Sequence, residues 1–302
     1  MDTRDTAFAV HGIIPAMVTP FKDDESLDLD ALRRLTRHLI AGGVHGLFPT
    51  GSQGEFYALT PSERQAIWAA VVEETAGRVP VYAGTGAITT AEVIKLNRLA
   101  EQAGVSAVSV ITPHFISPTQ EELYRHYMAI ADATPLPVIL YSNPGRTGGL
   151  NLSPALVARL AHHPNIVGVK DSSGDLSLTM AYLATTSDDF SVLLGRDTLI
   201  LAGLVHGAKG SITATANAAP RLVVAIYNLF SEGKLDEALD AQRRLAPLRD
   251  AFSLGTFPVV VKEALDLIGI PVGPTRGPVG PLAPEQRDRL RQVLATLSTQ
   301  GS

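Results

Sequence analysis

A lysine at the end of an apolar run is the residue of this sequence most suited to covalent chemistry. The run 166–169 is typical of a buried parallel strand, Lys170 follows it, and the polar residues 171–175 are typical of a loop before a helix. An ammonium group at the edge of an apolar interior is poorly solvated, which lowers its pKa. Such a lysine attacks carbonyl groups and forms Schiff bases near neutral pH. The competing interpretation is a strand-end lysine whose amine reaches solvent, and this segment alone leaves both open.

Imine chemistry also needs a group that moves protons close to the amine, and Tyr141 at a neighbouring strand end is the candidate. Its alternative role is that of an aromatic residue closing the mouth of the fold. Arg146 and Arg196 follow two further strand ends and could hold a carboxylate by bidentate hydrogen bonds. Either arginine alone is more often part of a surface ion pair.

A loop with small residues is the candidate site for a substrate carboxylate. Gly51 lets the backbone approach a ligand closely, while Ser52, Gln53 and the neighbouring N–H groups can donate to an anion. A purely structural turn has the same composition. The loop therefore does not identify a ligand by itself.

The elements that must position these residues are short apolar runs that alternate with helical patterns. The expected strands are residues 12–19, 46–50, 79–84, 107–112, 137–141, 166–170, 191–194 and 210–215. The expected helices between them are 28–41, 61–76, 90–103, 120–131, 154–162, 176–185 and 198–206, with N-caps at Thr60, Thr89 and Ser153. Eight such units in one series predict a (β/α)8 TIM barrel, and the alternative is an open doubly wound sheet.

After the eighth strand the pattern stays helical, which predicts a C-terminal helical extension. The helices expected there are 220–229, 235–251, 257–267 and 284–297, with a Pro/Gly-rich segment before the last. No linker composition isolates them. We therefore expect a barrel core over 1–218, and an eighth barrel helix plus extension over 219–302 that belongs to the same structural unit.

Composition excludes several classes of function. A net charge of −5 without a basic run argues against nucleic-acid binding, and no apolar stretch approaches the ~20 residues of a membrane helix. The absence of cysteine removes disulfides, thiolate metal sites and cysteine nucleophiles, and it is compatible with a cytoplasmic protein. Residues 1–10 lack the pattern of a signal peptide. No Gly-x-Gly-x-x-Gly follows the first strand, which argues against a nicotinamide enzyme.

Several motifs together carry a resemblance to a known family. They are Pro-Ala-Met-Val-Thr-Pro at 15–20, Gly-Ser-Gln-Gly-Glu at 51–55, Tyr-Ser-Asn-Pro-Gly-Arg-Thr-Gly at 141–148, Gly-Val-Lys-Asp-Ser-Ser-Gly at 168–174 and Gly-Ser-Ile-Thr-Ala-Thr-Ala-Asn at 210–217. In this order and spacing the chain resembles the dihydrodipicolinate synthase/N-acetylneuraminate lyase family of class I, Schiff-base-forming aldolases. The resemblance runs from about residue 12 to about residue 294.

The resemblance implies a role for individual residues. Lys170 matches the imine-forming lysine and Tyr141 the tyrosine that relays protons. The loop Gly51–Gln53 matches the segment that holds the carboxylate of pyruvate, although Gln53 replaces a residue that usually carries a hydroxyl. Ile212 matches a residue lining the pyruvyl pocket, and Arg146 matches the arginine that binds the second substrate's carboxylate in dihydrodipicolinate synthases.

The main departure lies after the fourth expected strand. Dihydrodipicolinate synthases usually have two tyrosines there, the second completing a proton relay across a dimer interface, and here His114 and Phe115 stand in their place. Phenylalanine has no hydroxyl to relay a proton. Asp171 also replaces the glutamate that commonly follows the lysine in those enzymes. His114 and Arg196 then become candidates for binding the hydroxyls or distal carboxylate of another substrate.

These observations predict a lyase that needs no metal or cofactor, because the iminium itself polarises the bond that breaks. Pyruvate is the imine-bound half and an aldehyde the other. The expected activity is that of a 2-keto-3-deoxy sugar acid or 4-hydroxy-2-oxo acid aldolase. The alternatives are a 4-hydroxy-tetrahydrodipicolinate synthase, a 2-keto-3-deoxy acid dehydratase and a non-catalytic 2-oxo-acid-binding paralogue. The resemblance also implies a homotetramer.

Overall fold

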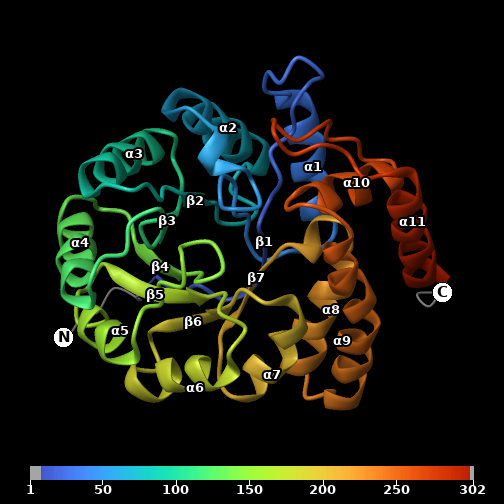
Figure 1. Ribbon diagram of the computed structural model, residues 1–302. Helices are drawn as coiled ribbons and strands as arrows, with labels where there is room; N and C mark the ends of the chain where they lie inside the picture. The colour runs from blue at the N-terminus through green and yellow to red at the C-terminus, as the bar shows by residue number, and fades with distance from the viewer. Residues whose placement is uncertain (1–7, 300–302) are drawn as a thin grey trace.

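A curled parallel sheet lies at the centre of the computed structural model, which describes residues 8–299 (Figure 1). Its strands are β1 (Gly12–Pro15), β2 (Tyr82–Gly84), β3 (Ala107–Ile111), β4 (Val138–Ser142), β5 (Ile166–Asp171), β6 (Ser191–Leu194) and β7 (Gly210–Thr213). They lie in the order β1-β7-β6-β5-β4-β3-β2, so strand order follows chain order around the sheet without reversal. The doubly wound alternative, which requires a reversal, is therefore wrong. Residues 1–7 and 300–302 lie outside the described residues. The first of these ranges is part of the segment that lacks a signal-peptide pattern.

The second expected strand, residues 46–50, is not a regular strand. Single parallel bridges join Leu47 to the residue before β2 and Phe48 to the residue after β1. The segment thus connects the two edges of the seven-stranded sheet, and the architecture is TIM-barrel-like. Pro49 has no N–H to donate and Thr50 has a left-handed φ of 55°, and together these two residues end the extended run.

Helices surround the sheet in a ring (Figure 1). They are α1 (Leu29–Ala41), α2 (Pro61–Thr75), α3 (Thr90–Gln102), α4 (Gln120–Asp132), α5 (Pro154–Leu160), α6 (Leu176–Thr185), α7 (Ile200–Val205), α8 (Pro220–Ser231), α9 (Leu235–Asp250), α10 (Val259–Leu267) and α11 (Pro284–Thr299). The N-caps expected at Thr60, Thr89 and Ser153 are confirmed, because each side-chain oxygen accepts a hydrogen bond from the backbone N–H three residues on. The helix expected over 198–206 begins instead with a 3-10 turn, Asp197–Leu199, before α7.

Alternation along the strands decides which side chains point inside the sheet. In β4, Ile139 belongs to the inner apolar cluster and Leu140 to the outer cluster beneath the helices. The same period places Tyr141 inside, in a third cluster. In β5, Val169 lies in the outer cluster, so the next residue, Lys170, faces inward. Both reactive candidates therefore project into the interior at the carboxyl ends of adjacent strands.

The segment after β7 forms helices that pack beside the sheet and on one another. α8 packs against α9, and α11 packs against both α9 and α10. Figure 1 shows α10 and α11 at the edge of the molecule, next to α1 and α8. A 3-10 turn, Ala251–Leu254, leads from α9 back toward the carboxyl ends of the strands. Residues far along the chain thus reach the edge of the sheet at which Lys170 lies.

Candidate active site

Lys170 is buried beneath aromatic rings at the carboxyl end of β5. Only 4% of its surface is exposed. Its Nζ lies 4.2 Å from the ring centre of Tyr141 and 4.9 Å from that of Phe48. Burial lowers the pKa of Lys170 below the ordinary lysine value, although Tyr141 and the carboxylate of Asp197 raise it. This environment favours the neutral amine, which is the nucleophilic form.

Tyr141 is the β4 residue paired in register with Lys170. Asn143 Nδ2 donates a hydrogen bond of 2.7 Å to its hydroxyl, and Ser52 Oγ lies 3.5 Å from the same oxygen. Burial raises the pKa of Tyr141, but the positive charge of Lys170 and interactions with Ser52, Asn143 and Ser172 outweigh it and hold the pKa below its usual value. A phenol with these properties, next to an amine, is suited to exchange a proton with it.

The loop beside Tyr141 presents unpaired polar groups to the same space. The Gln53 side chain is 3% exposed, and neither end of its amide has a hydrogen-bond partner among the described residues. A buried amide without partners is costly, so the arrangement favours a polar ligand that supplies them. Ser52, the neighbouring residue, lies at hydrogen-bond range from Tyr141. The loop is thus placed to hold the acid group of a substrate attached to Lys170.

A buried ion pair fixes the far end of this loop. Glu55, with a left-handed φ of 56° and no exposed surface, lies 2.7 Å from Lys262 of α10. Its second carboxylate oxygen accepts a hydrogen bond of 3.1 Å from the backbone N–H of Arg276. Lys262 also donates to the carbonyl of Pro274 at 2.6 Å. Burial lowers the pKa of Lys262 to about 8, against the opposing effect of Glu55. The loop is therefore held by the segment that follows β7.

One cavity of about 580 Å³ is lined by Lys170, Tyr141 and the loop residues Ser52 and Gln53. The residues that line it come from the carboxyl ends of the strands and from the turn after α9: Ala16, Ser52, Gln53, Tyr141, Asn143, Gly145, Arg146, Lys170, Ser172, Ser173, Gly195, Arg196, Asp197, Ile212, Ala214, Arg249, Phe252, Ser253, Gly255 and Phe257. Active sites of barrel enzymes lie at this face of the sheet. Its size suits a small metabolite.

The cavity brings together most of the residues selected from the sequence: Lys170, Tyr141, Ser52, Gln53, Arg146, Arg196 and Ile212. Gly51 lies just beyond, in a narrow space that Ser52 and Tyr141 also line. His114 does not line the cavity. Its half-buried ring packs edge-on against Phe56 with a centroid distance of 5.5 Å, and burial together with the charge of Arg64 lowers its pKa. The binding roles of all these residues stay predictions.

Six polar residues of the cavity were not selected from the sequence: Asn143, Ser172, Ser173, Asp197, Arg249 and Ser253. Asn143 and Ser172 each stand two residues after a selected residue, Tyr141 or Lys170, at the same strand end. This spacing could have identified them. Asp197 directly follows Arg196. Arg249 gave no signal, because it lies near the end of a helix that the pattern places outside the barrel.

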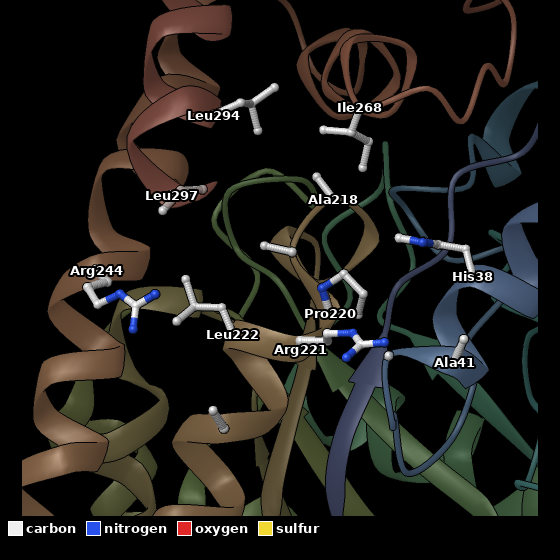
Figure 2. A pocket seen from close by; sticks show the side chains of 13 residues that line it. His38, Ala41, Ala218, Pro220, Arg221, Leu222, Arg244, Ile268, Leu294 and Leu297 are labelled. Carbon is white, nitrogen blue, oxygen red and sulfur yellow. The ribbon is translucent and has the colours of Figure 1, made fainter. Parts of the chain in front are cut away.

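A second cavity, of about 550 Å³, lies between α1, α8 and α11 (Figure 2). Its lining is mainly aliphatic, with Leu294 and Leu297 facing Ala218 and Pro220. The nitrogen-bearing side chains there are those of His38, Arg221 and Arg244. Among the described residues, no lysine or tyrosine lines this space, so the cavity around Lys170 is the better match to the imine chemistry predicted from the sequence.

The described residues contain no group of three or more His, Cys, Asp and Glu side chains arranged to hold a metal ion. None of the helices among them combines the length and apolar character needed to cross a bilayer.

Comparison with known proteins places the chain in a family. The model of the dihydrodipicolinate synthetase family matches residues 9–297. The chain belongs to that family. A relative from Methanospirillum hungatei, named 4-hydroxy-tetrahydrodipicolinate synthase, is 40% identical over 287 residues, covering 94% of this chain and 98% of the relative.

Solved structures of family members agree with the fold. Dihydrodipicolinate synthase from Thermotoga maritima has a TM-score of 0.93 at 34% identity, covering 96% of this chain and 99% of that one. A prophage protein of the dihydrodipicolinic acid synthase family from E. coli K12, in complex with pyruvate, has a TM-score of 0.92 at 35% identity, covering 95% and 98%. The protein is accordingly a pyruvate-dependent class I aldolase of the carbon–carbon lyase type, as this family is.

Proposed function

We propose that Lys170 forms an imine with the C2 ketone of pyruvate and that Tyr141 moves the protons of this step. The neutral amine attacks the ketone, and loss of water from the carbinolamine gives the protonated imine. Removal of a proton from C3 of the imine gives an enamine, which adds to the carbonyl carbon of an aldehyde. The observation that carries the proposal is the register pair of Tyr141 with Lys170, buried in one cavity.

The Gly51–Gln53 loop is proposed to hold the carboxylate of the bound pyruvate. The side-chain NH₂ of Gln53 has no hydrogen-bond partner among the described residues and lines the cavity, so it supplies a donor where the family usually has a hydroxyl. Ser52 Oγ stands 3.5 Å from the Tyr141 hydroxyl and is placed to pass a proton between tyrosine and substrate.

For the second substrate we propose aspartate semialdehyde, which makes the protein a 4-hydroxy-tetrahydrodipicolinate synthase. The names of relatives with 40% and 41% identity support this assignment over the sugar-acid aldolase expected from the sequence. Arg146 lines the cavity, where a guanidinium suits the carboxylate of the semialdehyde. After the carbon–carbon bond forms, the amine of the semialdehyde attacks the imine carbon and displaces Lys170.

A second candidate activity is the cleavage of a 2-keto-3-deoxy sugar acid or 4-hydroxy-2-oxo acid. Phe115 supports it, because this residue carries no hydroxyl and is 95% exposed, so it gives the cavity no proton relay. Cleavage is the reverse of condensation and uses the same lysine and tyrosine. A dehydratase would use the same imine with a different leaving group.

The test is a parallel assay of both directions with one preparation. Condensation of pyruvate with aspartate semialdehyde is measured beside pyruvate release from a panel of 2-keto-3-deoxy acids and 4-hydroxy-2-oxo acids. The synthase assignment predicts that kcat/KM is highest for the semialdehyde. A higher kcat/KM for any acid of the panel would overturn the assignment and favour the aldolase.

We propose further that the protein acts in the cytoplasm as a homotetramer. We also propose that residues 219–302 form one structural unit with the barrel core. The ion pair between Glu55, just after the Gly51–Gln53 loop, and Lys262 of α10 supports a single unit. The absence of cysteine is compatible with a reducing compartment.

A further inference from the structure

Positive charge is concentrated in the cavity of a protein that is acidic as a whole. The chain carries a net charge of −5. Among the described residues that line the cavity, the charged ones are Arg146, Lys170, Arg196 and Arg249 against a single acid, Asp197. The carboxylate of pyruvate, held at Gln53, accounts for only one negative charge. The outer part of the cavity is therefore suited to a further anionic group.

Arg249, from the last turn of α9, is aimed into the cavity by two contacts. Its Nε lies 3.4 Å from Asp197 Oδ2, and its guanidinium lies 4.9 Å from the ring centre of Phe252. Asp197 is itself fixed, because its Oδ1 accepts hydrogen bonds from the backbone of Ala214 and Thr215 and a bond of 2.6 Å from the Thr215 hydroxyl. Within the described residues no hydrogen bond engages the two terminal nitrogens of Arg249. They remain available to a ligand.

Unlike Arg249, the other two guanidinium groups have no acidic partner within salt-bridge distance among the described residues. Arg146 stacks on Phe257 at 4.0 Å from the ring centre, and Arg196 lies over Gly174, with Nε 3.3 Å from where a Cβ would stand. Burial lowers the pKa of Arg249, and the positive charges of Arg196 and Arg146 lower it further against the effect of Asp197. An anion bound among the three groups would relieve this repulsion.

We propose that Arg249 is a specificity-determining residue that binds an acidic group of the second substrate together with Arg146. This inference rests on the proposed imine chemistry at Lys170 and assigns to Arg249 the selection of an acidic aldehyde as the partner. The aldehyde carries an acid group remote from its carbonyl carbon, as semialdehydes do. Neutral sugar-type aldehydes leave the terminal nitrogens of Arg249 without a partner, and they bind weakly.

The test separates binding of the second substrate from catalysis. Borohydride reduction in the presence of pyruvate leaves a stable pyruvyl group on Lys170 and the outer cavity empty. Two aldehydes are then titrated into this trapped protein by calorimetry. Succinate semialdehyde ends in a carboxylate, and butanal has a methyl group in its place. The trapped wild type should bind the semialdehyde at least about 10-fold more tightly than butanal.

Arg249→Gln should weaken binding of succinate semialdehyde by about 10-fold to 100-fold and leave butanal unaffected. Arg249→Lys keeps the charge and should recover part of the loss. Arg243→Gln, an exposed arginine of the same helix that does not line this cavity, is the matched control and should bind as wild type does. In turnover with aspartate semialdehyde, Arg249→Gln should raise KM for the aldehyde and leave kcat and the KM for pyruvate near wild type.

Equal binding of succinate semialdehyde by Arg249→Gln and wild type would overturn the inference. A parallel loss for butanal would also overturn it, because it would indicate a structural role through Asp197. Failure of the proposed function looks different: no pyruvyl group is found on Lys170. In that case the same titrations of untreated protein still decide whether Arg249 selects an acidic aldehyde.

Discussion

At the scale of single residues, burial and one neighbour give a lysine and a tyrosine their chemistry. Lys170 is 4% exposed, so desolvation favours its neutral amine, while Tyr141 beside it gains from the lysine's charge when ionised. Both effects lower a pKa and favour loss of a proton, and the Lys170 Nζ lies 4.2 Å from the ring centre of Tyr141. A proton can therefore be exchanged within the pair at modest cost.

Removal of the Tyr141 hydroxyl should slow turnover without abolishing imine formation. Tyr141→Phe keeps the ring above Lys170 but loses the proton relay, so kcat should fall by about 10²-fold to 10⁴-fold. Trapping of pyruvate by borohydride should still reach completion on long incubation. Steady-state rates and mass spectrometry measure the two effects. A kcat within a few-fold of wild type would contradict the relay role.

The pH dependence of imine formation should report the lowered pKa of Lys170. The neutral amine attacks, so the rate of trapping by pyruvate and cyanoborohydride should rise with pH through that pKa, with a midpoint below the ordinary 10.5. Because the Tyr141 hydroxyl raises the pKa of Lys170, Tyr141→Phe should move the midpoint to lower pH. A wild-type midpoint at the ordinary lysine value would contradict a desolvated amine.

Sequence reasoning reached these residues because strand ends are local features. The apolar runs before Tyr141 and Lys170 identify buried strands, and alternation then decides that both point inward. The reach of Arg249 into the same cavity depends on how α9 packs and on its contact with Asp197. That packing is a long-range property which no local pattern records.

At the scale of elements, the site depends on the contact between one loop and the helices after β7. The loop that ends at Glu55 follows the irregular segment 46–50, whose strand pattern is broken by Pro49. Regular strand pairing therefore does not hold this loop in place. The ion pair between Glu55 and Lys262 does, and both side chains are almost fully buried. Helix limits were predictable from caps such as Thr60, whereas this ion pair was not, because its partners lie far apart in sequence.

Lys262→Met should destabilise the protein strongly, because it leaves the carboxylate of Glu55 buried without its counter-charge. Breaking a buried ion pair on one side costs about 3–5 kcal/mol of unfolding free energy. Chemical denaturation measures the change. The matched control is Arg159→Ala, which breaks a surface pair with Glu121 and should cause no measurable change. Equal stability of the two variants would contradict the structural role of Lys262.

At the scale of the whole molecule, one exposed aromatic residue is a candidate for a surface between copies. Phe115 is 95% exposed and has a left-handed φ of 71°, and the neighbouring Ile116 is 45% exposed. Exposure of a large apolar side chain to water is unfavourable, and a left-handed φ adds backbone strain at a residue that is not glycine. Such an arrangement persists where other contacts compensate for these costs. The proposed homotetramer supplies such contacts if this loop lies at an interface.

Sedimentation velocity should find a homotetramer for the wild type, and Phe115→Glu should shift the population toward smaller species. The glutamate would place an unpaired charge in a desolvated contact between copies. Glu232→Gln, an exposed residue between α8 and α9, serves as the control and should leave assembly unchanged. A wild-type monomer, or a tetramer that tolerates the charge, would contradict this placement of the interface.

The central claim, that Lys170 is the nucleophile for pyruvate, is tested most directly by reductive trapping and peptide mass spectrometry. The protein is incubated with pyruvate and borohydride, digested and mapped. One reduced pyruvyl group per chain is expected, located on Lys170, and none in Lys170→Ala. A trapped group on another residue, or its persistence in Lys170→Ala, would show that Lys170 is not the nucleophile.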